Sequence, residues 1–247
     1  MKRKALLIGY SGWDIRDEEP LKGVSFDLQG YKEFLMSISG GAWEHNEIEI
    51  VLDDELKNLE YILKNIRNEH NDIVFSVFTG HGDYDEHECC RRLEIAKDKI
   101  ISERELLGLA PKQILICDCC SKVSKSIIET THIVAESSIE TDLYIKQIAR
   151  KEYERICKIC PNQIIRLYAS AIGYYANDTE NGGLYSHCLL DTLQDISKTT
   201  NIVTAHNIAS QLVEKQTMIN PNYEIQKTGK IVPRLHSEYL LPGAIII

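Results

Sequence analysis

The chain has 247 residues, of which 43% are hydrophobic, and this is enough for one sizeable α/β core. Its 28 basic and 37 acidic side chains give a formal net charge of −9, which argues against a general electrostatic grip on nucleic acid or on an anionic membrane. The apolar run at residues 5–9 is too short for the hydrophobic region of a signal peptide. No apolar run in the sequence is nearly long enough to span a membrane. We therefore expect a cytoplasmic protein whose eight cysteines stay mostly reduced.

Compact apolar runs predict the strands of a sheet. Most of these runs are continuously hydrophobic rather than alternating, which is typical of parallel strands buried on both faces. The C-terminal stretch contains Pro233 and Pro242 and short β-like runs, which favour an edge strand or a wrapping segment. The predicted strands lie at residues 5–10, 48–52, 73–78, 113–116 and 164–169.

Apolar residues spaced three and four apart predict helices between these strands. The expected helices cover residues 24–35, 56–66, 143–156, 185–196 and 204–215. Strands that alternate with helices imply a mostly parallel central sheet of about six strands, flanked by helices on both faces.

Three helix starts carry capping signals. Asp53 or Asp54 is predicted to cap the second helix, and Thr204 is predicted to cap the last one. Ser102 begins the run Ser-Glu-Arg-Glu, a capping box that predicts a further short helix.

The region 122–162 is harder to assign because it is rich in Ser, Thr, Lys and Glu. We interpret it as a connector within a single domain that spans residues 1–247. The connector would join a larger part, residues 1–121, to a smaller part, residues 163–247.

Chemically capable residues follow two of the predicted strands. One strand runs into "FTGHGD", which contains His81, and the other runs into "ICDCCS", which contains Cys120. Reactive groups collect at the carboxyl ends of strands in open parallel sheets. A histidine and a cysteine on neighbouring strand ends could form a thiolate–imidazole dyad, although each motif alone would be weak.

The other cysteines and acids admit different roles. Cys157 and Cys160 form a CxxC that could bind zinc with other cysteines, but a second well-spaced CxxC is missing and the pair is expected to face a core. Cys117 and Cys119 lie two apart on a strand and are most simply core residues. The acidic residues within 83–88 are interpreted as a solvated loop, and His87, His187 and His206 as surface or cap residues.

The sequence resembles the caspase-like cysteine peptidases, and more closely their metacaspase-type and bacterial branch. The similarity covers nearly the whole chain, and the order of a His-Gly strand end before an Asp-x-Cys strand end is its most specific part. The family motif usually continues as Cys-His-Ser-Gly, whereas this chain continues as Cys-Ser-Lys, so the turn after the cysteine differs. The matching segments are KRKALLIGYSG, LKGVSFDL, VFSVFTGHGD, ILICDCCS and LYASAIGYYANDTENGGLYSHCLLDTL.

The resemblance implies a cysteine endopeptidase and assigns roles to individual residues. Cys120 would be the nucleophile and His81 its partner. The backbone N–H groups of Gly82 and Cys120 would form the oxyanion hole. Some relatives need calcium, but the aspartates that bind it have no clear counterparts here, so neither a metal nor a cofactor is expected.

Substrate preference is also implied by the resemblance. Asp27 and Asp118 match the two acidic residues with which metacaspases bind arginine or lysine before the cut, and Thr79 matches a small hydroxyl residue of the same pocket. A protein or peptide substrate with a basic P1 residue is therefore expected. Read without the family, Asp27 could equally be a helix cap or a first-turn carboxylate.

The resemblance also implies how the protein is activated and in which process it acts. Relatives are often activated by cleavage of their connector, and bacterial ones often act in antiviral defence or cell death with a partner protein. Two rival readings stay open. One is a catalytically silent caspase-like interaction module, and the other is a zinc-binding scaffold.

Overall fold

The computed structural model describes residues 1–15, 20–120, 140–179 and 181–247. In these residues a six-stranded sheet has the order β12-β8-β7-β3-β1-β2. All neighbouring strands are parallel except the edge strand β12, which runs antiparallel to β8. This confirms the predicted mostly parallel sheet and the C-terminal edge strand. The strands are β1 (Arg3–Tyr10), β2 (Ile48–Leu52), β3 (Ile73–Gly80), β7 (Lys112–Asp118), β8 (Gln163–Tyr168) and β12 (Gly229–Ile231).

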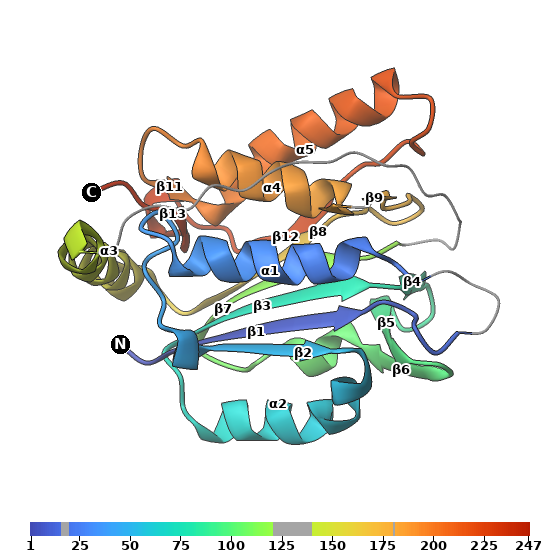
Figure 1. Cartoon of the computed structure of the whole chain (residues 1–247), viewed down its shortest axis with the longest axis horizontal. Coiled ribbons are helices and arrows are strands. Elements are labelled where there is room, and N and C mark those ends of the chain that lie inside the picture. Colours follow the sequence, from blue (N-terminus) through green and yellow to red (C-terminus); the bar gives the residue numbers. More distant parts are fainter. Residues whose placement is uncertain (16–19, 121–139, 180) are drawn as a thin grey trace.

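Helices cover both faces of the sheet (Figure 1). One face carries α1, α4 and α5, the other carries α2, and α3 lies near the amino ends of the strands. Because successive strand side chains point to opposite faces, Leu7 joins the core under α1 and Leu6 joins the core under α2. The helices are α1 (Gly23–Met36), α2 (Leu59–Asn68), α3 (Glu140–Ile159), α4 (Leu184–Gln194) and α5 (Ile202–Ile219).

A second, three-stranded antiparallel sheet follows β3 and was not predicted. It consists of β4 (Gly82–Asp85), β5 (Cys90–Ala96) and β6 (Lys99–Ser102). Its strands are short and carry many charges, so their alternating burial was masked by the polar composition. Leu93 and Ile95 of β5 point into the core on the α2 face, and this anchors the small sheet beside the carboxyl end of β3.

Helix starts agree with the predictions in part. Ser102 caps the short 3₁₀ helix η3 (Glu103–Leu106) with the predicted capping box. Neither Asp53 nor Asp54 caps the second helix, because both lie within a 3₁₀ helix, η2 (Asp53–Asn58), and α2 begins only at Leu59, after its N-cap Asn58. Asn201, rather than Thr204, caps α5, and its side chain accepts a hydrogen bond from the Thr204 N–H. The cap therefore lies three residues earlier than predicted.

The remaining short elements complete the chain. They are η1 (His45–Glu47), β9 (Asp178–Thr179), β10 (Gly182–Gly183), β11 (Thr200–Asn201), η4 (Ser237–Tyr239) and β13 (Pro242–Ala244). No helix in the described ranges is long and apolar enough to cross a membrane.

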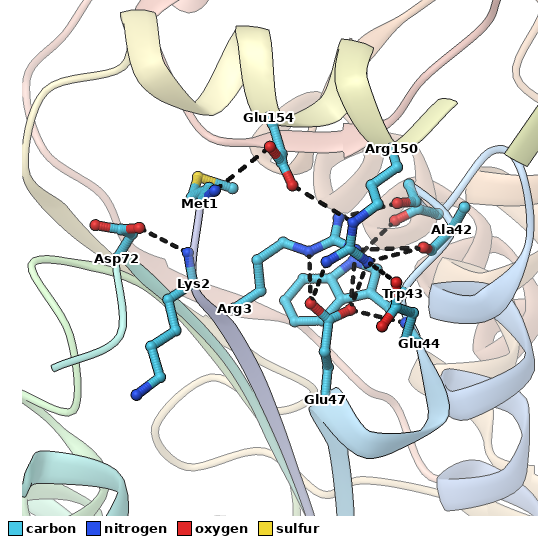
Figure 2. Close-up of polar contacts among 12 residues, drawn as sticks. Met1, Lys2, Arg3, Ala42, Trp43, Glu44, Glu47, Asp72, Arg150 and Glu154 are labelled. Carbon is cyan, nitrogen blue, oxygen red and sulfur yellow. Dashed lines mark hydrogen bonds and ion pairs between the residues drawn. The ribbon is translucent and has the colours of Figure 1, made fainter. Parts of the chain in front are cut away.

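A partly buried charge network attaches helix α3 to the amino end of the sheet (Figure 2). Glu47 accepts hydrogen bonds from Arg3 of β1 at 2.9 Å and from Arg150 of α3 at 2.6 Å. The Arg3 guanidinium also lies 4.7 Å from the centre of the Trp43 ring, and the ring of Tyr153 packs edge-on against Trp43. The paired arginines hold the pKa of Glu47 at about 2, although burial acts in the opposite direction. One carboxylate thus joins β1 to α3.

We predict that Glu47→Ala lowers the free energy of unfolding by about 3 kcal/mol, because it leaves the buried Arg3 charge without its carboxylate. Urea unfolding at neutral pH measures this loss. Lys57→Ala is the matched control, since it breaks the exposed Lys57–Asp54 pair and should cost less than about 0.5 kcal/mol. Equal losses in the two variants would contradict a structural role for the network.

Candidate active site

Strands β1, β3 and β7 end at the same edge of the sheet, where the chain order reverses between β1 and β3. Ligands bind outside the carboxyl ends of strands at such switch points. Tyr10 of β1 pairs with Gly80 of β3, and a Cβ at Gly80 would collide with the Tyr10 carbonyl oxygen. Gly80 has a φ of +147°, which also favours glycine. The strands can therefore approach closely just before His81.

His81 lies at the turn between β3 and β4 and is partly exposed. Its ring meets the Tyr10 ring edge-on, with 6.3 Å between the ring centres. A Cβ at Gly12 would lie 3.0 Å from His81 Nε2, so the bare backbone of the loop after β1 passes directly over the imidazole.

Cys120 lies two residues beyond the end of β7, the strand next to β3. Its thiol donates a hydrogen bond to the Ala176 carbonyl oxygen at 3.3 Å, and its sulfur accepts one from the Ala176 N–H at 3.4 Å. Burial raises the pKa of the thiol, and the Ala176 N–H offsets part of this rise. In the described part of the chain no hydrogen bond joins Cys120 to His81. The sulfur rests instead against the backbone of the loop after β8.

The neighbouring cysteines point elsewhere. Cys117 and Cys119 are buried in the core on the α2 face, as expected from the two-residue repeat of a strand. Burial raises the pKa of both thiols, and with 0% and 2% of their surface exposed neither can meet a substrate, whereas Cys120 is partly exposed. Gly82 lies against Cys119, because a Cβ at Gly82 would meet its sulfur at 3.0 Å. The oxyanion role assigned to Gly82 and Cys120 stays a prediction.

Asp27 of α1 and Thr79 of β3 are in direct contact. The Thr79 hydroxyl donates to Asp27 Oδ2 at 2.7 Å, and the Gly183 N–H donates to Asp27 Oδ1 at 3.0 Å. Gly183 is the N-cap residue immediately before α4. Asp27 therefore binds the start of a different helix and does not cap its own.

Asp118 reaches the same helix terminus from β7. Ser186 donates to Asp118 Oδ2 from its backbone N–H at 3.0 Å and from its hydroxyl at 2.6 Å. Asp118 pairs in register with Thr79 of β3, so the two side chains lie on the same face of the sheet. Thus the structure brings Asp27, Asp118 and Thr79 together, as the sequence predicted, while their role in binding substrate stays a prediction.

The sequence analysis missed a third acid, Asp178 of β9. A Cβ at Gly23, the first residue of α1, would collide with Asp178 Oδ1. Cβ atoms at Gly182 and Gly183 would likewise collide with the carboxyl groups of Asp27 and Asp118. Asp178 also pairs with Gly183 between β9 and β10, so the three acids lie around this glycine pair, and we call Asp27, Asp118 and Asp178 the carboxyl cluster. An aspartate before a Gly-Gly turn resembles an ordinary turn residue, so its sequence context carried little signal.

The carboxyl cluster is electrostatically uncompensated. Burial raises the pKa of both Asp27 and Asp118, and the charge of Asp118 raises that of Asp27 further. Burial and the charge of Asp118 raise the pKa of Asp178 to about 7. Within the described residues none of the three carboxyl groups has an ion-pair partner. Such a cluster attracts protons or a cation.

The alternative metal ligands have other partners or surroundings. Asp83 and Asp85 lie on β4, where both pair with Arg92, and not in the free loop that was expected. Cys157 and Cys160 are buried at the end of α3, facing the core as predicted. Within the described residues no group of three or more His, Cys, Asp or Glu side chains is placed to bind a metal.

One histidine was assigned wrongly. His206 is buried and shares a 2.7 Å hydrogen bond with the Tyr185 hydroxyl, so it is not a surface or cap residue. Burial lowers its pKa to about 4. Tertiary packing of α4 against α5 removes it from water, which its position in the sequence could not reveal.

Comparison with known proteins identifies similar chains. The family model described as the caspase domain matches residues 2–241. Caspase-1 from Spodoptera frugiperda is similar in structure, with a TM-score of 0.61, 11% identity, and coverage of 93% of this chain and 86% of that chain. A protein from Geobacter sulfurreducens also has a TM-score of 0.61, with 12% identity and coverage of 98% and 97%. No curated protein matches the chain.

We predict that Asp178→Asn stabilises the protein more at pH 8 than at pH 5. A carboxyl group whose pKa rises on folding destabilises the fold increasingly as pH rises from its ordinary pKa, 3.8, to the folded value, about 7, and the penalty levels off above that value. The gain in unfolding free energy should therefore be about 2–3 kcal/mol larger at pH 8 than at pH 5. Urea unfolding at both pH values measures it.

Asp191→Asn is the control for this prediction, because Asp191 is an exposed aspartate on α4. It should show no comparable gain. Equal stability changes at the two pH values in Asp178→Asn would contradict the unusual ionisation of Asp178.

Proposed function

The chain belongs to the caspase domain family of cysteine peptidases, and we propose that it is an endopeptidase that uses Cys120 and His81 to cleave proteins after arginine or lysine. The observation that carries the proposal is the uncompensated carboxyl cluster next to Cys120. Asp118 lies only two residues before the nucleophile. A cationic side chain placed there would bring its own scissile bond to the sulfur.

The charge of the carboxyl cluster supports a basic P1 residue. The buried acids Asp27 and Asp118 and the partly exposed Asp178 form an unfavourable group until a guanidinium or ammonium group binds among them. A substrate aspartate would be repelled by the same groups. Arginine offers a planar fork of donors that suits carboxylates well, so we expect it to be preferred over lysine.

The proposed mechanism is acyl transfer through a thioester. The Cys120 sulfur attacks the scissile carbonyl carbon, its proton passes to His81, and His81 then protonates the leaving amine. The N–H groups of Gly82 and Cys120 would stabilise the oxyanion. Water then hydrolyses the acyl-enzyme, which releases the carboxylate and restores the thiol. The bond between the thiol and Ala176 must break before the attack.

Activation by cleavage of the connector is part of the proposal. Residues 122–139 of the connector, with Lys122 and Lys125, lie outside the described residues. Lys146, Arg150 and Lys151 lie on α3, and Arg150 is held by Glu47. Because a helical, ion-paired residue is a poor cleavage site, we place cleavage before α3. A reducing cytoplasm fits the eight unpaired cysteines, and antiviral defence with a partner protein is the proposed setting.

We predict that a panel of fluorogenic peptides that differ only at P1 is cleaved after Arg and Lys, and not after Asp. Cys120→Ala and His81→Ala should each lower kcat/KM by at least about 10³-fold, because each removes one member of the dyad. The measurement is the initial rate with each peptide. Turnover of the Asp peptide would overturn the basic preference.

The same samples test the remaining alternatives. If the connector is self-cleaved, wild-type protein yields fragments on a denaturing gel and Cys120→Ala does not. Absence of turnover with every peptide, with or without calcium, would favour the silent interaction module. Stoichiometric zinc in the purified protein would favour the zinc-binding scaffold.

We predict that Asp178→Asn raises KM for arginine peptides by about 10–100-fold, the effect of losing one charge-assisted contact, with a smaller change in kcat. In the wild type KM should fall as pH rises from 6 to 8, because Asp178, with a pKa of about 7, becomes ionised. This trend should flatten in the variant. Asp191→Asn serves again as control, and an unchanged KM in Asp178→Asn would remove Asp178 from the specificity site.

A further inference from the structure

The loop between β8 and β9 carries two groups of the site. Ala176 contacts the Cys120 sulfur through both its N–H and its carbonyl oxygen. Asp178, two residues later, belongs to the carboxyl cluster. Asn177 lies between them, and in extended chain successive side chains point to opposite sides. Whatever holds Asn177 therefore sets the position of both neighbours.

Asn177 is held by the segment between α5 and β12, which is distant in sequence. Its side-chain Nδ2 donates to the Glu224 carbonyl oxygen at 2.8 Å, and its Oδ1 accepts from the Glu224 N–H at 2.9 Å. The side chain thus pairs with Glu224 as a neighbouring strand would. Asn177 is 7% exposed, so these bonds are shielded from water.

Gln226 completes this attachment and is fully buried. Its Oε1 accepts from the Asn177 N–H at 3.0 Å and from Asn177 Nδ2 at 2.9 Å. Its Nε2 donates to the Ala169 carbonyl oxygen at 2.9 Å. One amide side chain therefore joins the beginning of the loop, Ala169, to its end, Asn177.

All the side-chain hydrogen bonds of Gln226 go to the two ends of this loop, Ala169 and Asn177. Both ends of the amide bind the loop that carries Ala176 and Asp178, and a buried amide is costly unless its groups are paired. Replacing it by an apolar side chain would leave the Asn177 N–H without its acceptor. The loop would then lose the bond nearest to both functional groups.

We propose that Gln226 is a positioning residue of the active site, which fixes Asn177 and thereby holds the Ala176 backbone against Cys120 and the Asp178 carboxyl beside Asp27 and Asp118. Its effect on P1 selectivity rests on the function proposed above. Its effect on the loop and on the thiol does not, and the two can be measured separately.

Gln226→Met tests this proposal, because methionine keeps the length of the side chain but makes none of its three hydrogen bonds. We expect faster amide hydrogen exchange in residues 169–179. We also expect alkylation of Cys120 by iodoacetamide, followed by peptide mass spectrometry, to become about threefold faster or more, the size of one lost hydrogen bond. Cys89, which is exposed, reports in the same sample and should react at an unchanged rate.

Peptidase assays add a measurement, P1 selectivity, that would not change if Gln226 served the fold alone. The ratio of kcat/KM for an arginine peptide to that for its neutral analogue citrulline should fall in Gln226→Met, mainly through KM. Gln226→Glu keeps an acceptor for the Asn177 N–H groups and should recover part of the ratio. Gln163→Met is the matched control, since Gln163 is a buried glutamine at the far end of β8 that donates to the Tyr239 carbonyl oxygen at 2.7 Å. It should leave the loop and the ratio unchanged.

The outcomes separate this proposal from the proposed function. Unchanged exchange in residues 169–179 overturns the role of Gln226. Faster exchange with unchanged Cys120 alkylation and unchanged selectivity also overturns it, because Gln226 would then serve the fold alone. If no variant and no wild type cleaves any peptide, the function fails, and the alkylation rate of Cys120 alone decides whether Gln226 positions the site.

Discussion

The amino terminus of α4 is the point on which the rest of the site depends. Its first N–H groups have no partners within the helix, and Asp27 and Asp118 accept hydrogen bonds from Gly183 and Ser186. These carboxyl groups come from α1 and β7, so the same bonds join three elements that are far apart in sequence. The positive end of the helix dipole favours negative charge there. The acids thus have a structural reason for their position as well as the proposed one in binding substrate.

The two ends of the sheet differ in how their charged side chains are paired. At the amino end, Glu47 is matched by Arg3 and Arg150, and the network fastens α3. At the carboxyl end, the carboxyl cluster has no ion-pair partner in the described residues, and the pKa of its members is raised. Paired charges serve stability, whereas unpaired charges cost stability and are retained where a ligand supplies the missing partner. This contrast supports a cationic substrate group at the carboxyl end.

Sequence patterns were sufficient where a signal was local. The strand 73–78 was recognised from its unbroken hydrophobic run, and the buried central position of β3, between β7 and β1, explains that run. The capping box at Ser102 was recognised because it lies within four residues. The small sheet β4–β6 was missed because its polar residues hid the alternation, and Asp178 was missed because an acid beside glycines is common in turns. Gln226 had no local signal, since its partners lie about fifty residues earlier in the chain.

The sequence by itself determined the order of strands and helices, the family resemblance, and the residues placed just past the ends of β3 and β7. These are properties of neighbouring residues, because burial patterns and caps repeat over a few positions. Only the tertiary structure decided that Asp27, Asp118 and Asp178 meet at one glycine pair, that Cys120 rests on Ala176, and that a C-terminal glutamine holds the loop between them. Those contacts are set by strand pairing and helix packing across the sheet, which depend on the whole fold rather than on any single segment.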